Sequence, residues 1–176
     1  MTTTQAMTGA ITHTTVDTPF GPLLLAGTDD GLIRIAFERE GFVEVLDGLT
    51  RKLSARLGGD PEALEDPRRQ LEQYFAGERS EFTTPLDWRL VSGFRREALE
   101  AMAAIPYGET ITYRELAAAA GNPSAVRAAG HACATNPWPV IVPCHRVLRT
   151  GGGLGGYLGG LDMKRGLLAL ERAGAA

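Results

Sequence analysis

The break Gly121-Asn122-Pro123, which separates two short helical segments, constrains the fold more than any other feature of the sequence. Thr112 is followed three residues later by Glu115, the pattern of a capping box, and this predicts a helix over residues 113–120. Glycine and proline then end that helix, and a second one is expected over residues 125–135. Two short helices joined in this way predict a helix-turn-helix.

The second of these helices is unusually slim. Ser124 is expected to cap its start, and most of the residues that follow are alanine or glycine. Small side chains let the backbone of a helix approach its partner closely. That partner is either a nucleic-acid groove or a neighbouring helix, and the pattern alone does not decide between them.

The N-terminal part of the chain mixes strand and helix patterns. Two apolar runs with a glycine- and aspartate-rich turn between them predict a β-hairpin over residues 23–37. Apolar residues recur at helical spacing over residues 42–57, and a second helix is expected from Asp66-Pro67 to Gly77. A last strand is expected over residues 82–86.

Residues 87–92 have the character of a linker, and the helical segment after them, residues 94–104, ends at a proline and a glycine. We therefore predict two domains, an N-terminal α/β domain at residues 1–88 and a mostly helical domain at residues 89–176. The expected fold class is α/β in the broad sense, with the α+β arrangement of separate strand-rich and helix-rich parts.

The two halves of the chain also differ in charge. Residues 1–90 hold nine Lys and Arg against fifteen Asp and Glu, whereas residues 91–176 hold nine against six. The sequence pI of about 5.6 argues against indiscriminate binding of polyanions, although the basic half can meet phosphate through a local patch. An accidental imbalance between two solvated faces explains the same numbers.

The composition indicates the compartment in which the protein is expected and the state of its cysteines. No stretch approaches the roughly 18 apolar residues that span a bilayer, and the N-terminus lacks a basic region followed by an apolar core. We expect a cytoplasmic protein with no membrane partner. Only two cysteines occur, Cys133 and Cys144, so a disulfide framework is not expected and a reactive thiol is worth considering.

Cys144 stands at the end of a segment that prolines at 137, 139 and 143 should make stiff, extended and buried around residues 140–142. A free thiol is only slightly ionised at neutral pH, and an adjacent base or cation is the usual remedy. His145 and Arg146 are candidates by adjacency. The alternative is a buried cysteine beside a structural histidine, since neighbours on a strand point to opposite faces.

A metal site is a further alternative, because His131, Cys133, Cys144 and His145 supply two nitrogens and two sulfurs. Zinc ligands are usually paired two to four residues apart, however, and adjacent cysteine and histidine rarely bind one ion together. We therefore expect no metal at these residues.

The chain ends with a glycine-rich loop and a helix. Residues 151–160 are mostly glycine, so their backbone can pack against a flat ligand, but no phosphate-loop pattern follows. Residues 162–172 show an apolar helical face built from Met163, Leu167, Leu168 and Leu170. Glu171, taken alone, reads as a solvated surface carboxylate.

A series of short motifs in the second half occurs in a familiar order and spacing: Ile105-Pro106-Tyr107-Gly108-Glu109-Thr110, Thr112-Tyr113, Gly121-Asn122-Pro123, Arg127-Ala128, Asn136-Pro137, Ile141-Val142-Pro143-Cys144-His145-Arg146-Val147, Gly156-Tyr157-Leu158-Gly159-Gly160 and residues 164–171. Together they closely resemble the O6-alkylguanine-DNA alkyltransferase family. The strong part covers about residues 94–172, and Thr18-Pro19-Phe20-Gly21-Pro22-Leu23 and Tyr74-Phe75-Ala76-Gly77 resemble weaker N-terminal signatures.

The resemblance implies an N-terminal ribonuclease-H-like domain and a C-terminal winged-helix-like domain that carries the reaction. Its helix-turn-helix would enter the minor groove of double-stranded DNA, where small residues suit a narrow groove. Tyr113 would help rotate the damaged guanine out of the stack and hydrogen-bond it, and Arg127 would fill the space left behind. Asn122 and Ala128 would lie at the same DNA contact.

The resemblance also implies the chemistry. Cys144 would accept the alkyl group of O6-alkylguanine, and that of O4-alkylthymine, in a single-use reaction that forms a stable thioether. His145 would draw the thiol proton through a water molecule, with Glu171 orienting the imidazole. Asn136 would tie the turn between the recognition helix and the reactive cysteine. No cofactor is implied, and the protein is expected to be a monomer.

The remaining implied contacts form the base pocket. Pro139 and Tyr157 match its walls, the carbonyls of Cys144 and Val147 would read the guanine amino group, and backbone N–H groups near Tyr157 and Leu158 would approach O6. Leu158 replaces a residue that is often small or polar in the family. Arg95 and Leu99, on the predicted helix at residues 94–104, also depart from the family pattern.

Two other functions remain as alternatives. One is a non-catalytic sensor that binds alkylated DNA, although sensors of this kind carry another residue where Cys144 stands. The other is a thiol hydrolase or peroxidase that uses Cys144 and His145, which would leave the helix-turn-helix unexplained.

Overall fold

The computed structural model describes residues 9–176, which divide into two compact units. The first unit comprises the chain up to Glu72 together with Thr84–Asp87, and the second comprises Gln73–Thr83 and Trp88–Ala176. Residues 73–83 thus group with the second unit although they precede residue 88. The single cut between residues 88 and 89 stays a prediction.

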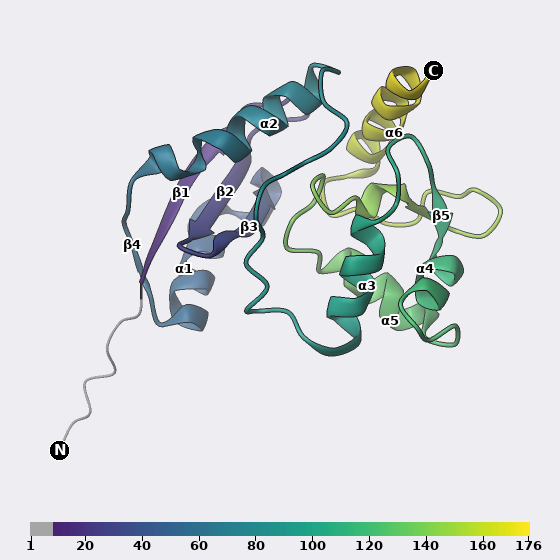
Figure 1. Ribbon diagram of the computed structural model, residues 1–176, viewed down its shortest axis with the longest axis horizontal. Coiled ribbons are helices and arrows are strands. Elements are labelled where there is room, and N and C mark those ends of the chain that lie inside the picture. The colour runs from purple at the N-terminus through teal and green to yellow at the C-terminus, as the bar shows by residue number, and fades with distance from the viewer. Residues whose placement is uncertain (1–8) are drawn as a thin grey trace. The chain divides into compact units, whose positions relative to one another are not determined.

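The first unit is built on a four-stranded sheet of order β3-β2-β1-β4 (Figure 1). Its elements, in chain order, are β1 (Ala10–Val16), β2 (Leu23–Thr28), β3 (Gly31–Phe37), the 3-10 helix η1 (Glu38–Glu40), α1 (Phe42–Leu53), β4 (Arg56–Leu57), the 3-10 helix η2 (Pro61–Leu64) and α2 (Glu65–Phe75). Strands β1, β2 and β3 pair antiparallel, and β4 pairs parallel to β1. The predicted hairpin is confirmed as β2 and β3.

Apolar residues of α1 and the sheet form the core of this unit. Leu46 and Leu49 of α1 pack with Ile11, Leu24 and Ile33 of the strands, and all five are buried. Strand β1 was not predicted, because its sequence, Ala-Ile-Thr-His-Thr-Thr-Val, is mostly polar and neutral. Its apolar ends are the residues that it buries.

Two expectations about the first unit are wrong. The helix expected over residues 42–57 ends at Leu53, because Ser54 takes the left-handed conformation (φ 48°) and the chain returns to the sheet as β4. The strand expected over residues 82–86 is reduced to a single bridge between Leu86 and Leu32. Pro85 lacks a backbone N–H to donate, and the apolar stretch is short, so the pairing does not extend further.

The second unit is mainly helical. After the last turn of α2 it contains α3 (Gly93–Ala103), β5 (Ile111–Thr112), α4 (Tyr113–Ala119), α5 (Val126–Ala134), the 3-10 helix η3 (Cys144–Arg146), β6 (Val147–Leu148) and α6 (Leu161–Ala175). Strands β5 and β6 form a short parallel pair. Small buried residues, Ala98, Ala120 and Ala132, let α3, α4 and α5 pack closely.

Helices α4 and α5 are the predicted helix-turn-helix. The Thr112 hydroxyl accepts from Glu115 N at 3.1 Å while the Glu115 carboxylate accepts from Thr112 N at 2.6 Å, which confirms the capping box. Gly121 has φ 91°, and the turn needs that conformation. Ser124 is not the cap of α5. Its backbone N and hydroxyl both donate to the Asn122 side chain instead.

Arg95, one of the departures from the family pattern, has a visible role within the unit. Its guanidinium donates to the hydroxyl of Thr135 at 3.0 Å and to the Thr135 carbonyl, at the end of α5. The Arg95 side chain thereby satisfies one of the terminal carbonyls of the slim helix. Leu99, the other departure, is fully buried.

The segment before Cys144 is buried as expected but it is not extended. Val140 has φ 75°, a left-handed conformation that is rare for a β-branched residue, and Val142 N donates to Trp138 O at 2.8 Å. The three prolines therefore shape a compact turn and not a strand. Cys144 opens the 3-10 helix η3, so Cys144 and His145 need not point to opposite faces.

Candidate active site

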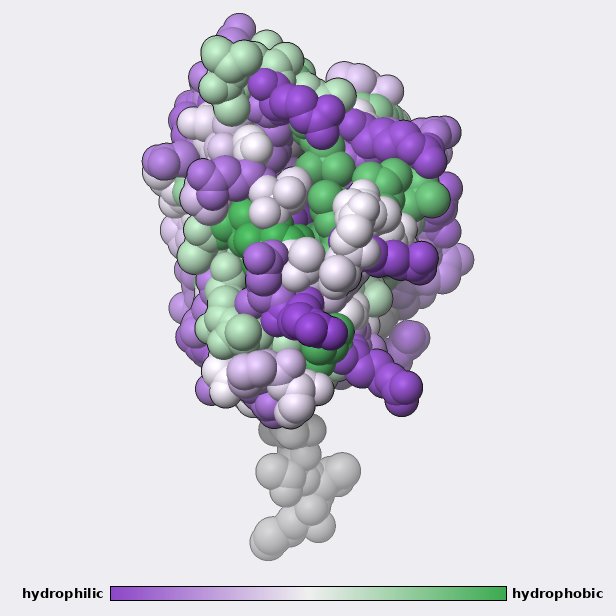
Figure 2. Space-filling model, turned by 90° about the vertical axis from the view of Figure 1, so that its right-hand side faces the viewer, coloured by the Kyte–Doolittle hydropathy of each residue, from purple (hydrophilic) through white to green (hydrophobic). Residues whose placement is uncertain are grey.

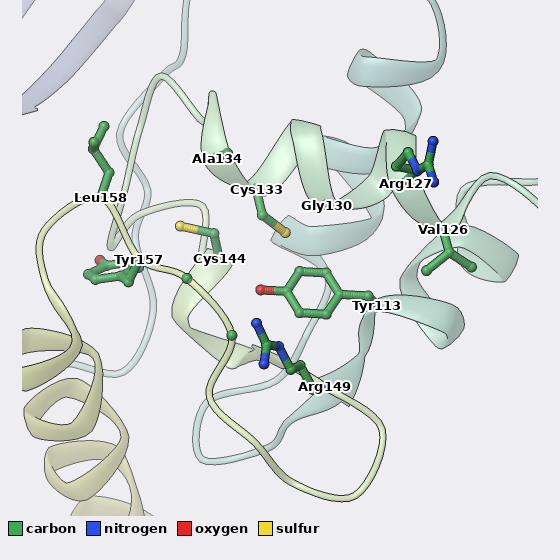
Figure 3. Close-up of a pocket in the computed structure, with 12 residues that line it drawn as sticks. Tyr113, Val126, Arg127, Gly130, Cys133, Ala134, Cys144, Arg149, Tyr157 and Leu158 are labelled. Carbon is green, nitrogen blue, oxygen red and sulfur yellow. The ribbon is translucent and has the colours of Figure 1, made fainter.

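Cys144 lies at a cavity of about 530 Å³ within the second unit. The residues that line it are Tyr113, Val126, Arg127, Gly130, Cys133, Ala134, Cys144, Arg149, Gly155, Gly156, Tyr157 and Leu158. They come from α4, α5, η3 and the glycine-rich loop, and Figure 3 shows Tyr113 and Cys133 facing the space between α5 and that loop. Cys144 itself is only 5% exposed, so a substrate has to reach it through the cavity.

Four of the lining residues belong to the predicted DNA- and base-binding set, namely Tyr113, Arg127, Tyr157 and Leu158, and the others of that set lie elsewhere. Arg127 is exposed on α5, and Val126 and Leu158 are partly exposed apolar residues at the same cavity. Asn122 and Ala128 are exposed on the helix-turn-helix but do not line the cavity. The face in Figure 2 shows apolar and hydrophilic side chains interspersed.

Tyr113 is the first residue of α4, and its hydroxyl approaches the glycine-rich loop. A Cβ atom placed on Gly155 would lie 2.6 Å from the Tyr113 hydroxyl oxygen, and Gly155 has φ 71°. Only glycine fits at this position for both reasons. Burial raises the pKa of Tyr113, with the thiols of Cys133 and Cys144 adding to the effect, so its hydroxyl keeps its proton and can donate.

Opposing effects act on the pKa of the Cys144 thiol. Burial raises its pKa, while a hydrogen bond from the Asn136 side chain and the positive charge of Lys164 act to lower it. Because the net shift is upward, the resting group is a thiol, and a base must remove its proton before the sulfur can attack. Burial raises the pKa of Cys133, on α5, to about 12, and the thiol of Cys144 adds to the shift, so Cys133 also rests as a thiol.

His145 is placed to act as that base. Its Nε2 lies 2.7 Å from Oε1 of Glu171, and both side chains are buried. Burial lowers the pKa of His145 despite the neighbouring carboxylate, so the resting imidazole is neutral. Since a carboxylate can only accept, Nε2 carries the proton, and Nδ1 keeps its lone pair. Nδ1 is buried with no hydrogen-bond partner among residues 9–176, so it is available to a bound water or the thiol.

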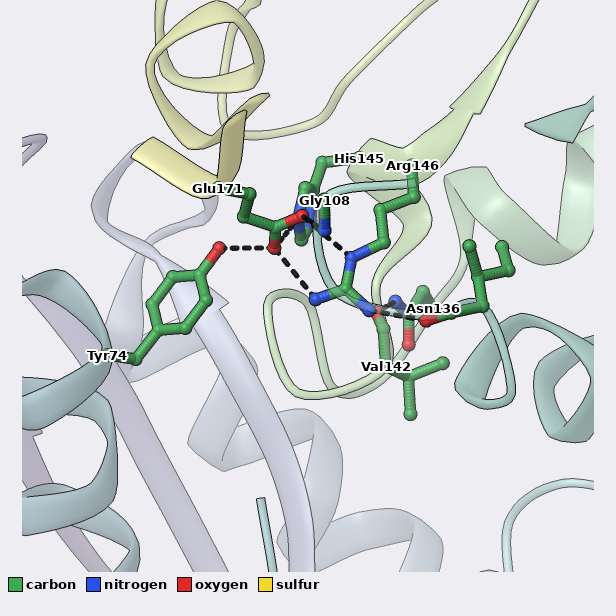
Figure 4. A network of polar contacts seen from close by, with 8 residues as sticks. Tyr74, Gly108, Asn136, Val142, His145, Arg146 and Glu171 are labelled. Atoms are coloured by element: carbon green, nitrogen blue, oxygen red, sulfur yellow. Dashed lines mark hydrogen bonds and ion pairs between the residues drawn. The ribbon is translucent and has the colours of Figure 1, made fainter. Parts of the chain in front are cut away.

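Glu171 is the centre of this network, although it reads as a surface carboxylate in the sequence (Figure 4). It is 1% exposed. Arg146 binds it in a fork, with Nε 2.8 Å from Oε2 and Nη2 2.8 Å from Oε1. Burial acts to raise the pKa of Glu171, but hydrogen bonds from His145, Arg146 and Tyr74 outweigh it and lower the pKa to about 2. Glu171 is therefore ionised throughout the neutral range.

Arg146 does not serve Cys144 as the adjacent cation that its position suggests. Its remaining guanidinium nitrogen, Nη1, donates to Ile105 O at 2.5 Å, and the side chain is buried. Its hydrogen bonds thus go to Glu171 and to the carbonyl of Ile105.

Asn136 ties together the turn that precedes the reactive cysteine. Its Nδ2 donates to Val142 O at 2.7 Å, and its Oδ1 accepts from Trp138 N at 2.9 Å. Pro139 and Val147 are buried in or beside this turn and do not line the cavity. Val147 O instead accepts a hydrogen bond from Lys164.

Lys164, on α6, was given no role from the sequence. It is fully buried, and its Nζ donates to the carbonyls of Val147 at 2.8 Å, Gly156 at 3.4 Å and Leu154. It therefore joins β6 to the glycine-rich loop at the edge of the cavity. The sequence carries a signal that Lys164 lies on the buried side of the helix. It stands three, four and seven residues before Leu167, Leu168 and Glu171, and this spacing places all four on one helix face.

Metal binding finds little support in the part of the chain that the structure describes. Residues 9–176 contain no group of three or more His, Cys, Asp or Glu side chains that could hold an ion. No helix among these residues is long and apolar enough to cross a membrane.

Comparison with known proteins gives a consistent result over nearly the whole chain. Residues 11–88 match the family model described as the ribonuclease-like domain of 6-O-methylguanine DNA methyltransferase, and residues 93–173 match the model of its DNA-binding domain. A methylated-DNA–protein-cysteine methyltransferase of Mycolicibacterium paratuberculosis is 44% identical over 92% of this chain and 93% of its own.

Solved structures agree. The O6-methylguanine methyltransferase of Mycobacterium tuberculosis superimposes with a TM-score of 0.81 at 40% identity, covering 94% of this chain and 95% of that one. A structure of the protein from the same organism in complex with DNA gives a TM-score of 0.80 at 39% identity, covering 93% and 94% of the two chains.

Proposed function

Because the chain belongs to the 6-O-methylguanine DNA methyltransferase family, we propose that it repairs DNA by moving the alkyl group of O6-alkylguanine to Cys144. One observation supports Cys144 as the acceptor above all others. The thiol borders a cavity, and the next residue, His145, is held by Glu171 at Nε2 while its Nδ1 has no hydrogen-bond partner in the described part of the chain. A buried lone pair beside a buried thiol is the arrangement that general-base activation requires.

The reaction balances without an external reagent. Nδ1 of His145 takes the thiol proton through a bound water, and the imidazolium that forms is stabilised by Glu171. The thiolate attacks the alkyl carbon, a carbon–sulfur bond forms, and the carbon–oxygen bond breaks with its electron pair passing to O6. The proton lost by the thiol ends on the guanine. The product thioether has no route back in this site, so each molecule reacts once.

Entry of the base requires that it leave the stack, because O6 of a stacked guanine is out of reach of a protein nucleophile. We assign this step to the helix-turn-helix in the minor groove. Ala128 and its small neighbours let α5 approach the groove, and the exposed Arg127 at the cavity takes the place of the rotated base. The Tyr113 hydroxyl donates to the base inside the cavity. An O4-alkylthymine fits the same chemistry.

The proposal also covers the oligomeric state of the protein, its need for a cofactor and its compartment. The second unit supplies both the acceptor and the DNA contact, so a single chain is sufficient and we propose a monomer. No step of the transfer calls for a cofactor. Since the proposed substrate is DNA, we propose that the protein acts in the cytoplasm.

The test is a mass measurement on duplex DNA that carries O6-methylguanine. Wild-type protein should gain one methyl group, located on Cys144, and never more than one per molecule. Cys144→Ala should gain none, whereas the matched control Cys133→Ala, which removes the other thiol of the cavity, should react like wild type. Repeated turnover, or a methyl group on Cys133, would contradict the proposal.

A further inference from the structure

Tyr74 is a buried aromatic residue in the last turn of α2, and its hydroxyl reaches the active-site network. Its ring packs against those of Phe75, Phe82 and Tyr107, and the side chain is fully buried. The hydroxyl donates to Oε1 of Glu171 at 2.7 Å (Figure 4). Burial, together with the charge of Glu171, raises the pKa of Tyr74 far above its ordinary value, so this hydroxyl always carries its proton and always donates.

The oxygen that Tyr74 binds is the one that holds the catalytic base. Oε1 of Glu171 also lies 2.7 Å from Nε2 of His145 and 2.8 Å from Nη2 of Arg146. Each hydrogen bond donated to the carboxylate stabilises its charge, so the carboxylate attracts the proton of another donor less strongly. The strength with which Glu171 holds the proton of His145 therefore depends on the hydroxyl of Tyr74.

We propose that Tyr74 is a positioning residue of the transfer site, whose hydroxyl fixes the Glu171 carboxylate and limits how tightly it holds the His145 proton. This inference rests on the proposed alkyl transfer to Cys144. Neutral His145 is the form that accepts the thiol proton, and a carboxylate with an unshared charge would favour the imidazolium before any substrate arrives. Tyr74 thus helps keep the base in its accepting form.

Charged and titratable groups surround His145 and Glu171, and they come from every element that packs against these two residues. They are Tyr74 on α2, Tyr107 in the loop after α3, Cys144 and Arg146 on η3, Tyr157 in the glycine-rich loop and Lys164 on α6. Arg146 and Lys164 act to lower the pKa of His145, and Glu171 acts to raise it. Removing the Tyr74 hydroxyl strengthens only the effect of Glu171, so the direction of the change is fixed: the pKa of His145 rises.

The inference also assigns a task to the chain before residue 88. Helix α2 begins within the first unit, at Glu65, and its last turn groups with the second unit. Tyr74 and Glu171 therefore lie within the same unit. The Tyr74-Phe75-Ala76-Gly77 signature then has a chemical reason in addition to its packing.

The alternative is that Tyr74 has a structural role only: its ring fills the core, and its hydroxyl bonds to Glu171 without affecting His145. Tyr74→Phe separates the two, with Tyr107→Phe as the matched control. Tyr107 lies in the same cluster, 6.2 Å from the Tyr74 ring and 5.7 Å from the Arg146 guanidinium, and its hydroxyl makes no hydrogen bond to Glu171. Both variants remove one hydroxyl group from one aromatic ring.

The readout is the titration of the His145 ring nitrogens by NMR, together with the acid limb of the pH–rate profile for methyl transfer. In Tyr74→Phe the titration and the limb should both move to higher pH, by about half a unit or more, as expected for one lost hydrogen bond to a charged partner. Tyr107→Phe should leave both in place. An unmoved titration in a folded Tyr74→Phe protein overturns the inference.

A second variant covers the case in which Tyr74→Phe does not fold. The analogue 3-fluorotyrosine at position 74 keeps the ring and its packing but makes the hydroxyl a stronger donor, so the titration should move to lower pH. A shift in the other direction, or none, contradicts the inference. Because the NMR titration needs no substrate, it also separates the two proposals: wild-type protein that fails to transfer methyl groups refutes the function, whatever His145 does.

Discussion

The side-chain amide of Asn136 spans the turn before the reactive cysteine, donating to Val142 O at 2.7 Å and accepting from Trp138 N at 2.9 Å. This pair of bonds holds Val140 in its left-handed conformation and sets where η3 begins. The reactivity of Cys144 therefore depends on a residue eight positions earlier.

We expect Asn136→Asp to weaken both the fold and the thiol. Aspartate keeps the acceptor for Trp138 N but cannot donate to Val142 O, and its charge lies beside the sulfur. Val142 O would keep only its hydrogen bond from Cys144 N. One lost hydrogen bond costs about 0.5–1.5 kcal/mol, so the melting temperature should fall. The apparent pKa of Cys144, followed by its rate of reaction with iodoacetamide, should rise. Asn122→Asp is the control, since Asn122 is exposed and its Oδ1 only accepts.

The protonation of Glu171 should determine how the stability of the fold depends on pH in the acid range. The folded-state pKa of about 2 lies below the ordinary value of 4.5, so the stabilisation is complete above pH 4.5 and is lost as the pH falls toward 2. A shift of this size corresponds to roughly 3 kcal/mol of unfolding free energy. Denaturant unfolding should show wild type losing stability over that window. Glu171→Gln should be less stable at neutral pH, with a flatter profile, and a profile as steep as that of wild type would refute this assignment.

Lys164→Met should both shift the reactivity of Cys144 and destabilise the fold. The substitution removes the charge that lowers the pKa of Cys144, and it removes the donor to the carbonyls of Val147, Gly156 and Leu154. Loss of the buried donor to Val147 O costs about 1–3 kcal/mol, so the melting temperature should fall. The iodoacetamide profile of Cys144 should move to higher pH. Arg165→Met, the next residue and an exposed one, should leave the profile unchanged.

Gly155→Ala should displace Tyr113. The added Cβ would lie 2.6 Å from the Tyr113 hydroxyl oxygen, and the left-handed backbone adds about 1–2 kcal/mol of strain. Gly152→Ala has the same backbone strain at φ 91° but meets nothing within 4 Å. Both variants should lose similar stability, and only Gly155→Ala should lose methyl transfer as well. Equal transfer rates in the two would show that the contact with Tyr113 does not matter.

Arg127→Ala tests base rotation apart from chemistry. Arg127 is exposed on α5, and Glu171, His145 and Arg146 make no hydrogen bond to it. Repair of duplex DNA should therefore fall much more, by about tenfold or beyond for a step that unstacks a base, than reaction with free O6-benzylguanine. Arg114→Ala, an exposed arginine of α4 away from the cavity, should affect both substrates little. Equal losses on the two substrates would contradict an intercalating role.

Local rules predicted the elements whose signals are local. The capping box of Thr112 and Glu115, the turn at Gly121 and the hairpin of β2 and β3 all depend on residues a few positions apart, and all are confirmed. Strand β1 and the end of α1 at Leu53 were missed, because their form is set by pairing with distant strands.

The sequence by itself determined the type of chemistry: one cysteine beside a histidine, a slim helix and a series of motifs that resemble one family. The family resemblance implied that His145 and Glu171 activate Cys144, but only the tertiary structure decided which other residues join them. Taken one at a time, Glu171 is typical of a surface residue and Tyr74 of a core residue, and only their contacts distinguish them. They acquire their roles because folding removes water from residues far apart in the chain, and a buried charge must then find its partners among whatever side chains lie beside it.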